Sequence, residues 1–531
     1  MAAETVDTPA GHERLVQALL SAPVPGLPPG PRQRMQTHIS SLVLAGDLVL
    51  KLRKPLTLPF LDFSTVERRR LDCLEELRLN RRTAPSLYLG VMAIAGTLQA
   101  PRLVPDDPAP LDWALAMRRF GQDQLLDRLA RAGRLDGACL DALAEEIAAF
   151  QAALPPSPAG FGGAAEARRW AMENFDELLP HPLMQARRQG LEVLRDWTEA
   201  AFLRHAACIE ARREAGFVRE GHGDLHLGNL VMIDGRPKAF DAVEFNPALR
   251  HVDVVCDIAF TFMDLWRHGL AEGAWRFVNT WADRSADHAG LVLLRLHATY
   301  RALVRAKVAL LRAPQDAAGA LQAAERDLAL AEHLAGVHAP ARPPCLVLTC
   351  GPSGSGKSTV AALLSQALGA VRLRSDVERK RLHGLDPLQR PAAAQRRALY
   401  SAPASRRTFD HLAAVSRTLL QGGVDVIVDA AFLSRAERDR FARLAGDAGA
   451  RRLLLQCQAP PAVMRERVRR RGSRDDDPSD ADEAVLQAQL ERQDPVAAGE
   501  AAVLIDTDTP LDALRARCRA LASGWQEGAP Q

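Results

Sequence analysis

Apolar positions near the start of the chain alternate with polar ones and favour a small antiparallel sheet with one helix. Residues 40–54 contain two apolar runs on either side of an Ala-Gly-Asp turn, which predicts two paired strands. A helical pattern covers residues 64–82, and two further strand-like segments follow at 86–94 and 112–120. This order predicts a mixed lobe of strands around one helix.

Helical spacing then dominates from about residue 122 to 220. Two short apolar runs, 230–233 and 237–241, flank the pair Asp234-Gly235, which is a strong hairpin signal. Residues 251–335 return to helical spacing. The first part of the chain is therefore predicted to be an α+β domain over residues 35–335.

A Pro-rich segment, 336–344, predicts a linker, and beyond it strands and helices alternate regularly over residues 345–525. Short and almost continuous apolar runs between helices are typical of a parallel sheet that is covered on both faces. The five predicted strands are 345–350, 371–374, 424–430, 451–457 and 501–506. The second part is therefore predicted to be an α/β domain with a five-stranded parallel sheet.

Composition narrows the class of protein without assigning a function. The 531 residues are 47% hydrophobic and 25% charged, and the net charge of +3 is small for a partner such as nucleic acid or an anionic membrane. The 8 cysteines are scattered and form no C-x-x-C pair, which fits a reducing compartment. No apolar run is long enough to span a membrane, and the N-terminus lacks the apolar core of a signal peptide. We expect a cytoplasmic protein whose partners are small molecules; its oligomeric state stays open.

The segment from His222 to Asn229 is the first candidate for chemistry. Asp224 and Asn229 have the D-x-x-x-x-N spacing of a kinase catalytic loop, in which the carboxylate takes a proton from the acceptor hydroxyl and the amide oxygen binds Mg²⁺. The predicted hairpin then delivers Asp241 to the same place. Converging carboxylates need a cation to neutralise them, which Mg²⁺ supplies.

This segment, His-Gly-Asp-Leu-His-Leu-Gly-Asn, resembles the H-G-D-x-H-x-x-N loop of the aminoglycoside phosphotransferase and choline kinase-like superfamily. The resemblance covers residues 35–335 and implies a two-lobed, protein-kinase-like fold. It also implies Asp224 as the catalytic base and Asn229 and Asp241 as metal ligands. His226 is expected to shape the loop by hydrogen bonding, and Asp257, in an apolar helix, is expected to brace it.

By the same resemblance Lys51 would bind the α- and β-phosphates of ATP, and Glu76 on the following helix would pair with it. Glu75 is the alternative partner, and Lys54 is the alternative phosphate ligand. No G-x-G-x-x-G motif precedes Lys51. This departure keeps open a nucleotide-sensing regulatory protein in which one domain binds ATP without turning it over.

The second candidate site is a complete Walker A motif, placed between an apolar strand and an Ala- and Leu-rich helix. Glycines let consecutive backbone N–H groups face the phosphates at the N-terminus of a helix. Lys357 would reach the β- and γ-phosphates and Ser358 would bind Mg²⁺. The predicted nucleotide-binding residues are Gly351, Pro352, Ser353, Gly354, Ser355, Gly356, Lys357, Ser358 and Thr359.

Polar residues after the next strands complete this second site. Asp376 is expected at the end of the second strand as a catalytic, substrate-binding carboxylate, and Asp429 at the end of the third as a magnesium ligand acting with Ser358. A lid with one transition-state arginine is expected after the fourth strand, and the sequence does not say which arginine acts. The candidates are Arg465, Arg467, Arg469, Arg470 and Arg471.

The second part resembles the P-loop kinases of the gluconate kinase, zeta-toxin and polynucleotide kinase-like group. Together the two resemblances identify a bifunctional, ATP- and Mg²⁺-dependent phosphotransferase in which each domain phosphorylates a small molecule, the first on a hydroxyl group. The alternatives are the regulatory protein described above and nucleic-acid end repair by the P-loop half. The low net charge argues against end repair.

Overall fold

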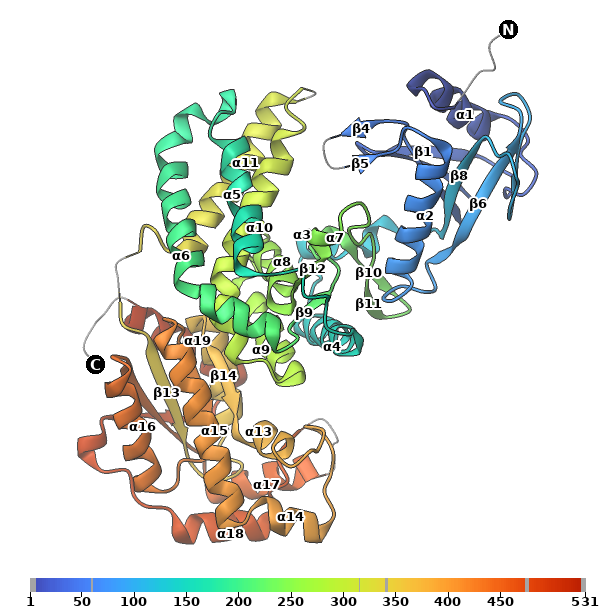
Figure 1. Ribbon diagram of the computed structural model, residues 1–531. Coiled ribbons are helices and arrows are strands. Elements are labelled where there is room, and N and C mark those ends of the chain that lie inside the picture. The colour runs from blue at the N-terminus through green and yellow to red at the C-terminus, as the bar shows by residue number, and fades with distance from the viewer. Residues whose placement is uncertain (1–5, 59–60, 315, 340–341, 473–476, 527–531) are drawn as a thin grey trace. The chain divides into compact units, whose positions relative to one another are not determined.

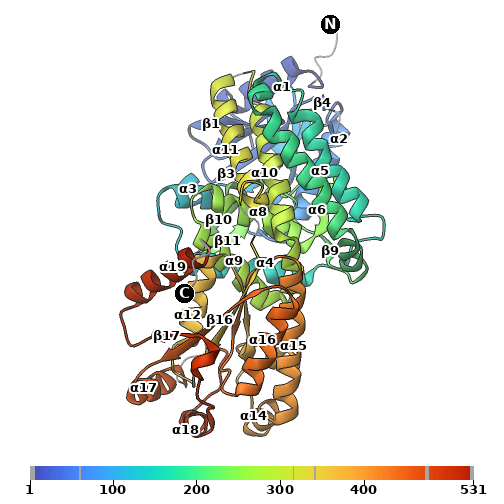
Figure 2. The same ribbon diagram turned by 90° about the vertical axis from the view of Figure 1, so that its left-hand side faces the viewer.

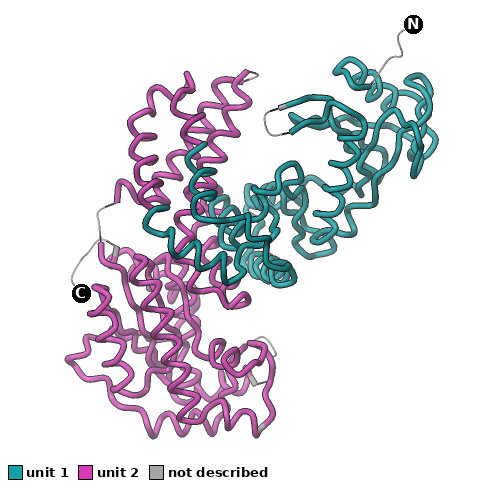
Figure 3. The backbone as a smooth tube through the Cα atoms, viewed as in Figure 1, with its two compact units in different colours: residues 1–173, 202–264 teal, residues 174–201, 265–531 magenta. Residues whose placement is uncertain are grey.

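The computed structural model describes residues 6–58, 61–314, 316–339, 342–472 and 477–526. Two compact units divide the chain (Figure 3): unit 1 contains residues 1–173 and 202–264, and unit 2 contains residues 174–201 and 265–531. The domain boundaries expected from the sequence stay a prediction, and residues 340–341 of the expected linker lie outside the described residues.

A six-stranded sheet in the order β1-β2-β3-β8-β6-β7 forms the first part of unit 1 (Figure 1). All of its pairings are antiparallel, and the β2–β3 hairpin turns at the predicted position. Helix α2, Val66–Asn80, follows β3 in the chain and packs on β6 and β8. The strands are β1 Arg32–Gln36, β2 Ser40–Ala45, β3 Leu48–Arg53, β6 Tyr88–Gly96, β7 Pro101–Val104 and β8 Asp112–Arg118. Short strands β4, Thr57–Leu58, and β5, Leu61–Asp62, pair separately.

The remaining part of unit 1 carries the predicted hairpin, β10 Leu230–Ile233 with β11 Arg236–Ala239. A second antiparallel pair consists of β9, Val218–Glu220, and β12, His251–Asp253. The segment between these two strands in the chain contains residues 221–250. The sequence predicted helix from residue 251 onward, and β12 corrects this, because its strand residues directly precede helix α8, Val254–Arg267. Other helical elements that lie wholly or partly in unit 1 are α1 Pro9–Ser21, η1 Gln122–Gln124, α3 Leu126–Arg131, α4 Gly137–Ala153, α5 Ala164–Leu178, α6 Arg188–Glu214, η3 Leu227–Asn229 and α7 Pro247–Arg250.

Unit 2 contains a parallel sheet in the order β14-β15-β13-β16-β17, as the run of strands predicted. Helices α12 and α19 share an apolar cluster with one face of this sheet, and α15 and α16 cover the other face (Figure 2). The strands are β13 Cys345–Cys350, β14 Val371–Arg374, β15 Val426–Asp429, β16 Arg451–Gln458 and β17 Ala502–Asp506. The helices after β13 are α12 Lys357–Leu368, α13 Ser375–Arg381, α14 Ala393–Leu399, α15 Ala402–Gln421, α16 Arg435–Asp447, α17 Pro461–Gly472, α18 Glu483–Arg492, η5 Ala498–Glu500 and α19 Leu511–Gln526.

Helices that precede the parallel sheet in the chain also belong to unit 2. Helix α9, Ala271–Ser285, packs on α12 and β14, and α10 pairs with α11. The others are η2 Pro182–Arg187, η4 Ala289–Leu293, α10 Leu294–Leu310 and α11 Ala317–Ala335. The predicted fold class, a kinase-like α+β part followed by a five-stranded parallel P-loop part, is confirmed. In the described part of the chain, no helix combines the length and apolar character needed to cross a membrane.

Candidate functional site

Helix α8 holds the loop that carries Asp224. The Asp257 carboxylate accepts hydrogen bonds from the backbone N–H groups of His222 at 3.0 Å and Gly223 at 2.9 Å. Gly223 has a φ of +82°, and a Cβ at this position would lie 2.8 Å from the carbonyl oxygen of Leu249. Asp257 therefore braces the loop as predicted, and the tight turn requires a glycine.

Two more polar residues of α8 fix the next part of the loop. Thr261 Oγ1 donates to the carbonyl oxygen of Leu225 at 2.6 Å, and the Asp264 carboxylate accepts from the N–H of Leu227 at 2.9 Å. With Asp257 they share one face of the helix. Thr261 and Asp264 were not predicted from the sequence. Polar residues at helical spacing in an apolar helix are nevertheless a usable signal, because buried polar groups need partners.

Histidines of the loop act as hydrogen bonders. His222 Nε2 lies 2.9 Å from the carbonyl oxygen of Phe240, which can only accept, so this nitrogen carries the proton. Burial lowers the pKa of His222 and keeps the ring neutral. His226 Nδ1 accepts from the N–H of Gly228 at 3.0 Å, which confirms the loop-shaping role expected for it.

Asp224, Asn229 and Asp241 lie together, as the spacing and the hairpin predicted. Asn229 Nδ2 donates to Asp224 Oδ2 at 3.0 Å and lies 3.5 Å from the carbonyl oxygen of Asp241. The side chains of Asp224 and Asp241 are 35% and 43% exposed, so both can meet a molecule from solution. The catalytic and metal-binding roles of these three residues stay predictions.

Asp241 is held in a left-handed backbone conformation, with a φ of +62°. Its N–H donates to Tyr88 Oη at 3.0 Å, and the N–H of Ala242 donates to Asn80 Oδ1 at 2.9 Å. Tyr88 and Asn80 are both buried. A non-glycine residue in this region is uncommon and clusters at functional sites, where surrounding contacts over-determine it.

Lys51 forms the expected ion pair with Glu76. Its Nζ donates to Glu76 Oε1 at 2.8 Å and to Asp241 Oδ1 at 2.7 Å. Burial opposes the charge on Lys51, but Asp241 and Glu76 outweigh burial and raise its pKa. Glu75 instead pairs with Arg78 and Arg250, and Lys54 Nζ donates to the carbonyl oxygen of Thr37. Glu75 and Lys54, the two alternatives considered from the sequence, therefore make other contacts.

A buried arginine that the sequence analysis missed extends this cluster. Arg53 is fully buried, and its Nη2 donates to Glu76 Oε2 and to Glu244 Oε1, both at 2.5 Å, while its Nε lies 2.5 Å from Asp72 Oδ2. Lys51 and Arg53 alternate with one residue between them, which puts both on one face of β3. Asp72 and Glu76 share a face of α2. The spacing of Lys51 and Arg53 on the strand, and of Asp72 and Glu76 on the helix, could have indicated this cluster from the sequence.

The cluster fits a divalent cation. Even without Glu244, whose raised pKa keeps it protonated at neutral pH, the carboxyl groups of Asp72, Glu76 and Asp241 outnumber the cations Lys51 and Arg53. No three His, Cys, Asp or Glu side chains among the described residues are placed to hold a metal by themselves. Mg²⁺ is commonly held by one or two carboxylates together with substrate phosphates. Asp241 and the amide oxygen of Asn229 would supply that limited set, because the Asn229 amide nitrogen already faces Asp224.

We expect Glu244 to make the stability of unit 1 depend on pH. Burial raises the pKa of Glu244 from 4.5 to about 8, with Arg53 opposing the shift and Glu76 adding to it. The folded state therefore holds a proton that the unfolded chain releases, so stability falls as pH rises from 4.5 to about 8. Glu244→Gln, which is neutral throughout, should remove this loss.

Urea unfolding of the protein across that pH range measures the effect. The Glu244→Gln variant should gain stability relative to wild type as pH rises. Glu67→Gln is the control, because Glu67 lies exposed on α2 and should leave the pH profile unchanged. Parallel profiles for wild type and Glu244→Gln would show that Glu244 is ionised in the folded state at every pH tested.

The Walker A segment forms a loop between β13 and α12. Gly351 and Gly354 have φ values of +142° and +80°, and a Cβ on either would lie 2.5 Å from a backbone oxygen, that of Cys457 or Met464. Glycine is therefore required where the loop passes closest to its neighbours. The N–H of Ser353 donates to Gln489 Oε1 at 2.7 Å, so an acceptor oxygen already meets a donor of the loop.

Lys357, Ser358 and Asp429 meet at the start of α12. Ser358 Oγ donates to Asp429 Oδ1 at 3.2 Å, and Lys357 Nζ donates to the carbonyl oxygen of Pro352 at 2.7 Å. Burial lowers the pKa of Lys357 against the effect of Asp429 and Asp376. Burial also raises the pKa of Asp429 against the effect of Arg374. A half-buried amine and a buried carboxylate beside a glycine loop fit the phosphates and Mg²⁺ of a nucleotide.

Asp376 lies in a different element from the one expected. Strand β14 ends at Arg374, and Asp376 belongs to the first turn of α13, because the chain turns directly from strand into helix. Partial burial and the carboxylates of Asp376 and Asp480 raise the pKa of Tyr400. Asp376 and Asp480 are thus both within electrostatic range of Tyr400, and Asp480 lines a cavity.

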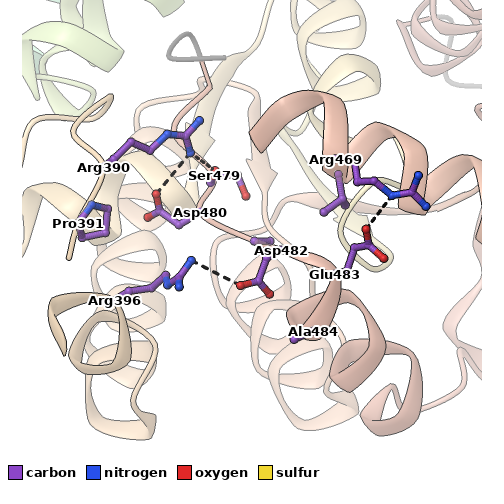
Figure 4. Close-up of a pocket in the computed structure, with 11 residues that line it drawn as sticks. Arg390, Pro391, Arg396, Arg469, Ser479, Asp480, Asp482, Glu483 and Ala484 are labelled. Atoms are coloured by element: carbon purple, nitrogen blue, oxygen red, sulfur yellow. Dashed lines mark hydrogen bonds and ion pairs between the residues drawn. The ribbon is translucent and has the colours of Figure 1, made fainter. Parts of the chain in front are cut away.

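This cavity of about 520 Å³ contains three arginine–carboxylate pairs (Figure 4). The charged atoms are 3.6 Å apart in the pair Arg390–Asp480, 3.5 Å in Arg396–Asp482 and 2.7 Å in Arg469–Glu483. The lining residues are Arg390, Pro391, Arg396, Val468, Arg469, Ser479, Asp480, Ala481, Asp482, Glu483 and Ala484. Alternating charges of this kind suit a polar molecule better than an apolar one.

Helix α17 carries all five candidate lid arginines. Arg467 Nη1 donates to the carbonyl oxygen of Gly354 at 3.2 Å, and its Nη2 donates to that of Thr507 at 2.7 Å. Arg467 therefore supports the phosphate loop through its backbone. Arg469 pairs with Glu483 at the cavity, and which arginine meets a phosphate stays open.

Comparisons with known proteins agree with a P-loop assignment for the second half. A family model described as an AAA domain matches residues 346–496. A crystal structure of a choline/ethanolamine kinase family protein from Mesorhizobium loti is similar with a TM-score of 0.38 and 14% identity, covering 61% of this chain and 94% of that one. A gluconokinase from Sinorhizobium meliloti is similar with a TM-score of 0.26 and 21% identity, covering 35% of this chain and 97% of that one. The AAA domain match and the Walker A geometry support ATP-dependent phosphotransfer.

Two mycobacterial proteins are similar over most of the chain. They are named Uncharacterized protein Mb2027c, from Mycobacterium bovis, and Uncharacterized protein Rv2004c, from Mycobacterium tuberculosis. Each is 31% identical over 440 residues, which is 82% of this chain and 85% of the relative. The chain therefore belongs to the same protein family as Mb2027c and Rv2004c.

Proposed function

We propose that the protein is a bifunctional, ATP- and Mg²⁺-dependent phosphotransferase. The site in unit 1 transfers the γ-phosphoryl group of ATP to a hydroxyl group of a small molecule. The P-loop site in unit 2 binds a second ATP and phosphorylates a second small acceptor. One observation carries the proposal: each unit brings together a lysine, a carboxylate and either an amide or a hydroxyl group. These residues are Lys51, Asp241 and Asn229 in unit 1, and Lys357, Asp429 and Ser358 in unit 2.

In unit 1, Asp224 would accept the proton of the acceptor hydroxyl as the new phosphate ester forms. The α8 residues hold its loop in place, so the carboxylate needs little reorganisation before transfer. Lys51, kept charged by Glu76, would neutralise the α- and β-phosphates of ATP. Mg²⁺ would neutralise charge on the transferring group when bound through Asn229 and Asp241.

In unit 2, Lys357 would leave its contact with Pro352 and donate to the β- and γ-phosphates. Ser358 and Asp429 would hold the metal ion that accompanies the nucleotide. Asp376, within electrostatic range of Tyr400, would orient the acceptor. The ion-paired walls of the cavity that Asp480 lines favour a small polar acceptor over an extended polyanion such as nucleic acid.

A metabolite panel tests the proposal. The full-length protein should consume ATP in the presence of Mg²⁺ with two different acceptors, and mass spectrometry should find each product one phosphoryl group heavier. Chelation of Mg²⁺ should stop both reactions. Nucleotide binding without turnover at the unit 1 site would instead support the regulatory alternative, and phosphorylation of oligonucleotide ends would support the end-repair alternative.

A further inference from the structure

The C-terminal end of helix α9 contributes a buried carboxylate to the neighbourhood of the P-loop site. Asp283 is 9% exposed, and its Oδ2 lies 3.1 Å from Arg372 Nη2 and 3.6 Å from Arg374 Nη1. Both arginines are on β14, whereas α9 precedes residues 346–496, which the AAA domain model matches. The carboxylate thus comes from outside the segment that forms the nucleotide fold.

Arg374 connects Asp283 to the candidate metal ligands. Its Nε lies 3.8 Å from Asp429 Oδ2, and Asp429 Oδ1 accepts from Ser358 Oγ at 3.2 Å. Asp283 and Asp429 therefore share one guanidinium between them. If Asp283 did not share it, Arg374 would be free to pair with Asp429 alone.

The register of β14 against α9 is fixed by a second residue of the helix. Asn279 Oδ1 accepts from the N–H of Arg372 at 2.7 Å, and Asn279 Nδ2 donates to the carbonyl oxygen of Ala370 at 3.0 Å. Strand β14 is at the edge of the sheet, so Asn279 satisfies backbone groups that lack a further strand. The positions of both arginines relative to Asp283 are thus set by the backbone.

Charges around Asp283 show that it acts as an anion. Burial alone would raise its pKa, but hydrogen bonding from His288 and the charges of Arg372 and Arg374 outweigh burial and lower the pKa well below the usual range. Glu378 also faces His288, at 3.7 Å. The ionised Asp283 offsets positive charge that would otherwise face the metal ligands.

We propose that Asp283 is a positioning residue of the P-loop site, which pairs with Arg372 and shares the Arg374 guanidinium with Asp429, so that Asp429 and Ser358 stay available to Mg²⁺ bound with nucleotide. The inference rests on the proposed function of that site. Its consequence is that the P-loop site depends on helix α9, even though the AAA domain match does not include this helix.

Titration of the full-length protein with ADP, by calorimetry, tests the inference with and without Mg²⁺. Lys357 carries the phosphate contact in both conditions, whereas Asp429 is needed only with metal. Asp283→Asn should raise the Mg²⁺ concentration that half-saturates ADP binding by roughly 10-fold, because two guanidinium groups then lose their nearest anion. Binding of ADP in the presence of a chelator should be unchanged or slightly tighter.

Three further variants separate charge from packing. Asp283→Glu should keep the wild-type Mg²⁺ requirement. Asp283→Asn combined with Arg372→Gln should recover it, because the excess positive charge is removed. Glu272→Gln breaks another ion pair of α9, with Arg519 at 2.6 Å, and should have no effect.

The outcomes are distinct. An unchanged Mg²⁺ requirement in Asp283→Asn overturns the inference and leaves the proposed function intact. The inference is also overturned if Asp283→Asn weakens ADP binding equally with and without Mg²⁺ and the added Arg372→Gln change does not restore it. Asp283 would then act only through packing. A wild-type protein that binds no ADP overturns the proposed function of the P-loop site and this inference with it.

Discussion

Asp224→Asn should lower phosphoryl transfer at the unit 1 site by about 10²–10⁴-fold, because the variant lacks the carboxylate that takes the hydroxyl proton. The new amide can still accept from Asn229 Nδ2 through its oxygen, so the loop should keep its shape. ATP binding should be nearly unchanged. The rate of formation of the unit 1 product, measured by mass spectrometry with the acceptor identified from the panel, gives the effect.

The hairpin supplies a matched control for this variant. Asp234 is in the turn between β10 and β11 with a φ of +48°, a conformation that asparagine also accepts. Asp234→Asn should therefore leave both activities at the wild-type level. A rate for Asp224→Asn within a few-fold of wild type would rule out Asp224 as the base.

Lys357→Ala should lower product formation at the P-loop site by at least about 10²–10³-fold, the effect of removing one donor that stabilises developing charge. Its side chain is half-buried at the phosphate loop, and no described carboxylate forms an ion pair with it, so the phosphates are its natural partner. Binding of ADP should weaken as well, since charge-assisted hydrogen bonds contribute about 1.5–3 kcal/mol. Calorimetry and product formation measure the two effects.

Lys307→Ala is the control, because Lys307 is also in unit 2 but makes a surface pair with Glu177 at 3.2 Å. It should leave nucleotide binding unchanged. The unit 1 product should form at the wild-type rate in Lys357→Ala, and the P-loop product should do so in Asp224→Asn. Loss of both products from either single change would show that the two sites are not independent.

Local patterns predicted much of the fold. All five strands of the parallel sheet were found, because each carries apolar residues between two helical segments. Burial is continuous in β13 and β15 and interrupted in β14, β16 and β17. Strand β1 was missed, because its residues, Arg-Gln-Arg-Met-Gln, are mostly polar and form an edge strand with no buried position. Strand β12 was missed because it is a three-residue strand next to a helix. Pairing partners, which no local pattern encodes, make these segments strands.

The motifs of both sites were also local. Asp224 and Asn229 are joined by one short loop, and Gly351 to Gly356 form one turn between a strand and the helix that begins at Lys357, so their spacing alone predicted their neighbourhood. Asp376 was misplaced by one element because the boundary between β14 and α13 has no loop residue to mark it. Boundaries depend on a few hydrogen bonds, whereas an apolar period depends on many positions.

The sequence by itself predicted the five strands of the parallel sheet and the two phosphate-handling motifs, and the family resemblance implied the pairing of Lys51 with Glu76, with Glu75 as the alternative. Only the tertiary structure decided that Arg53 bonds to Glu244, 191 positions away, and that Asp283 faces Arg372 and Arg374. The reason is physical: a motif is recognisable when the backbone of one short segment fixes its geometry. A buried charge takes whichever opposite charge the folded chain brings within reach, and its position in the sequence does not name that partner.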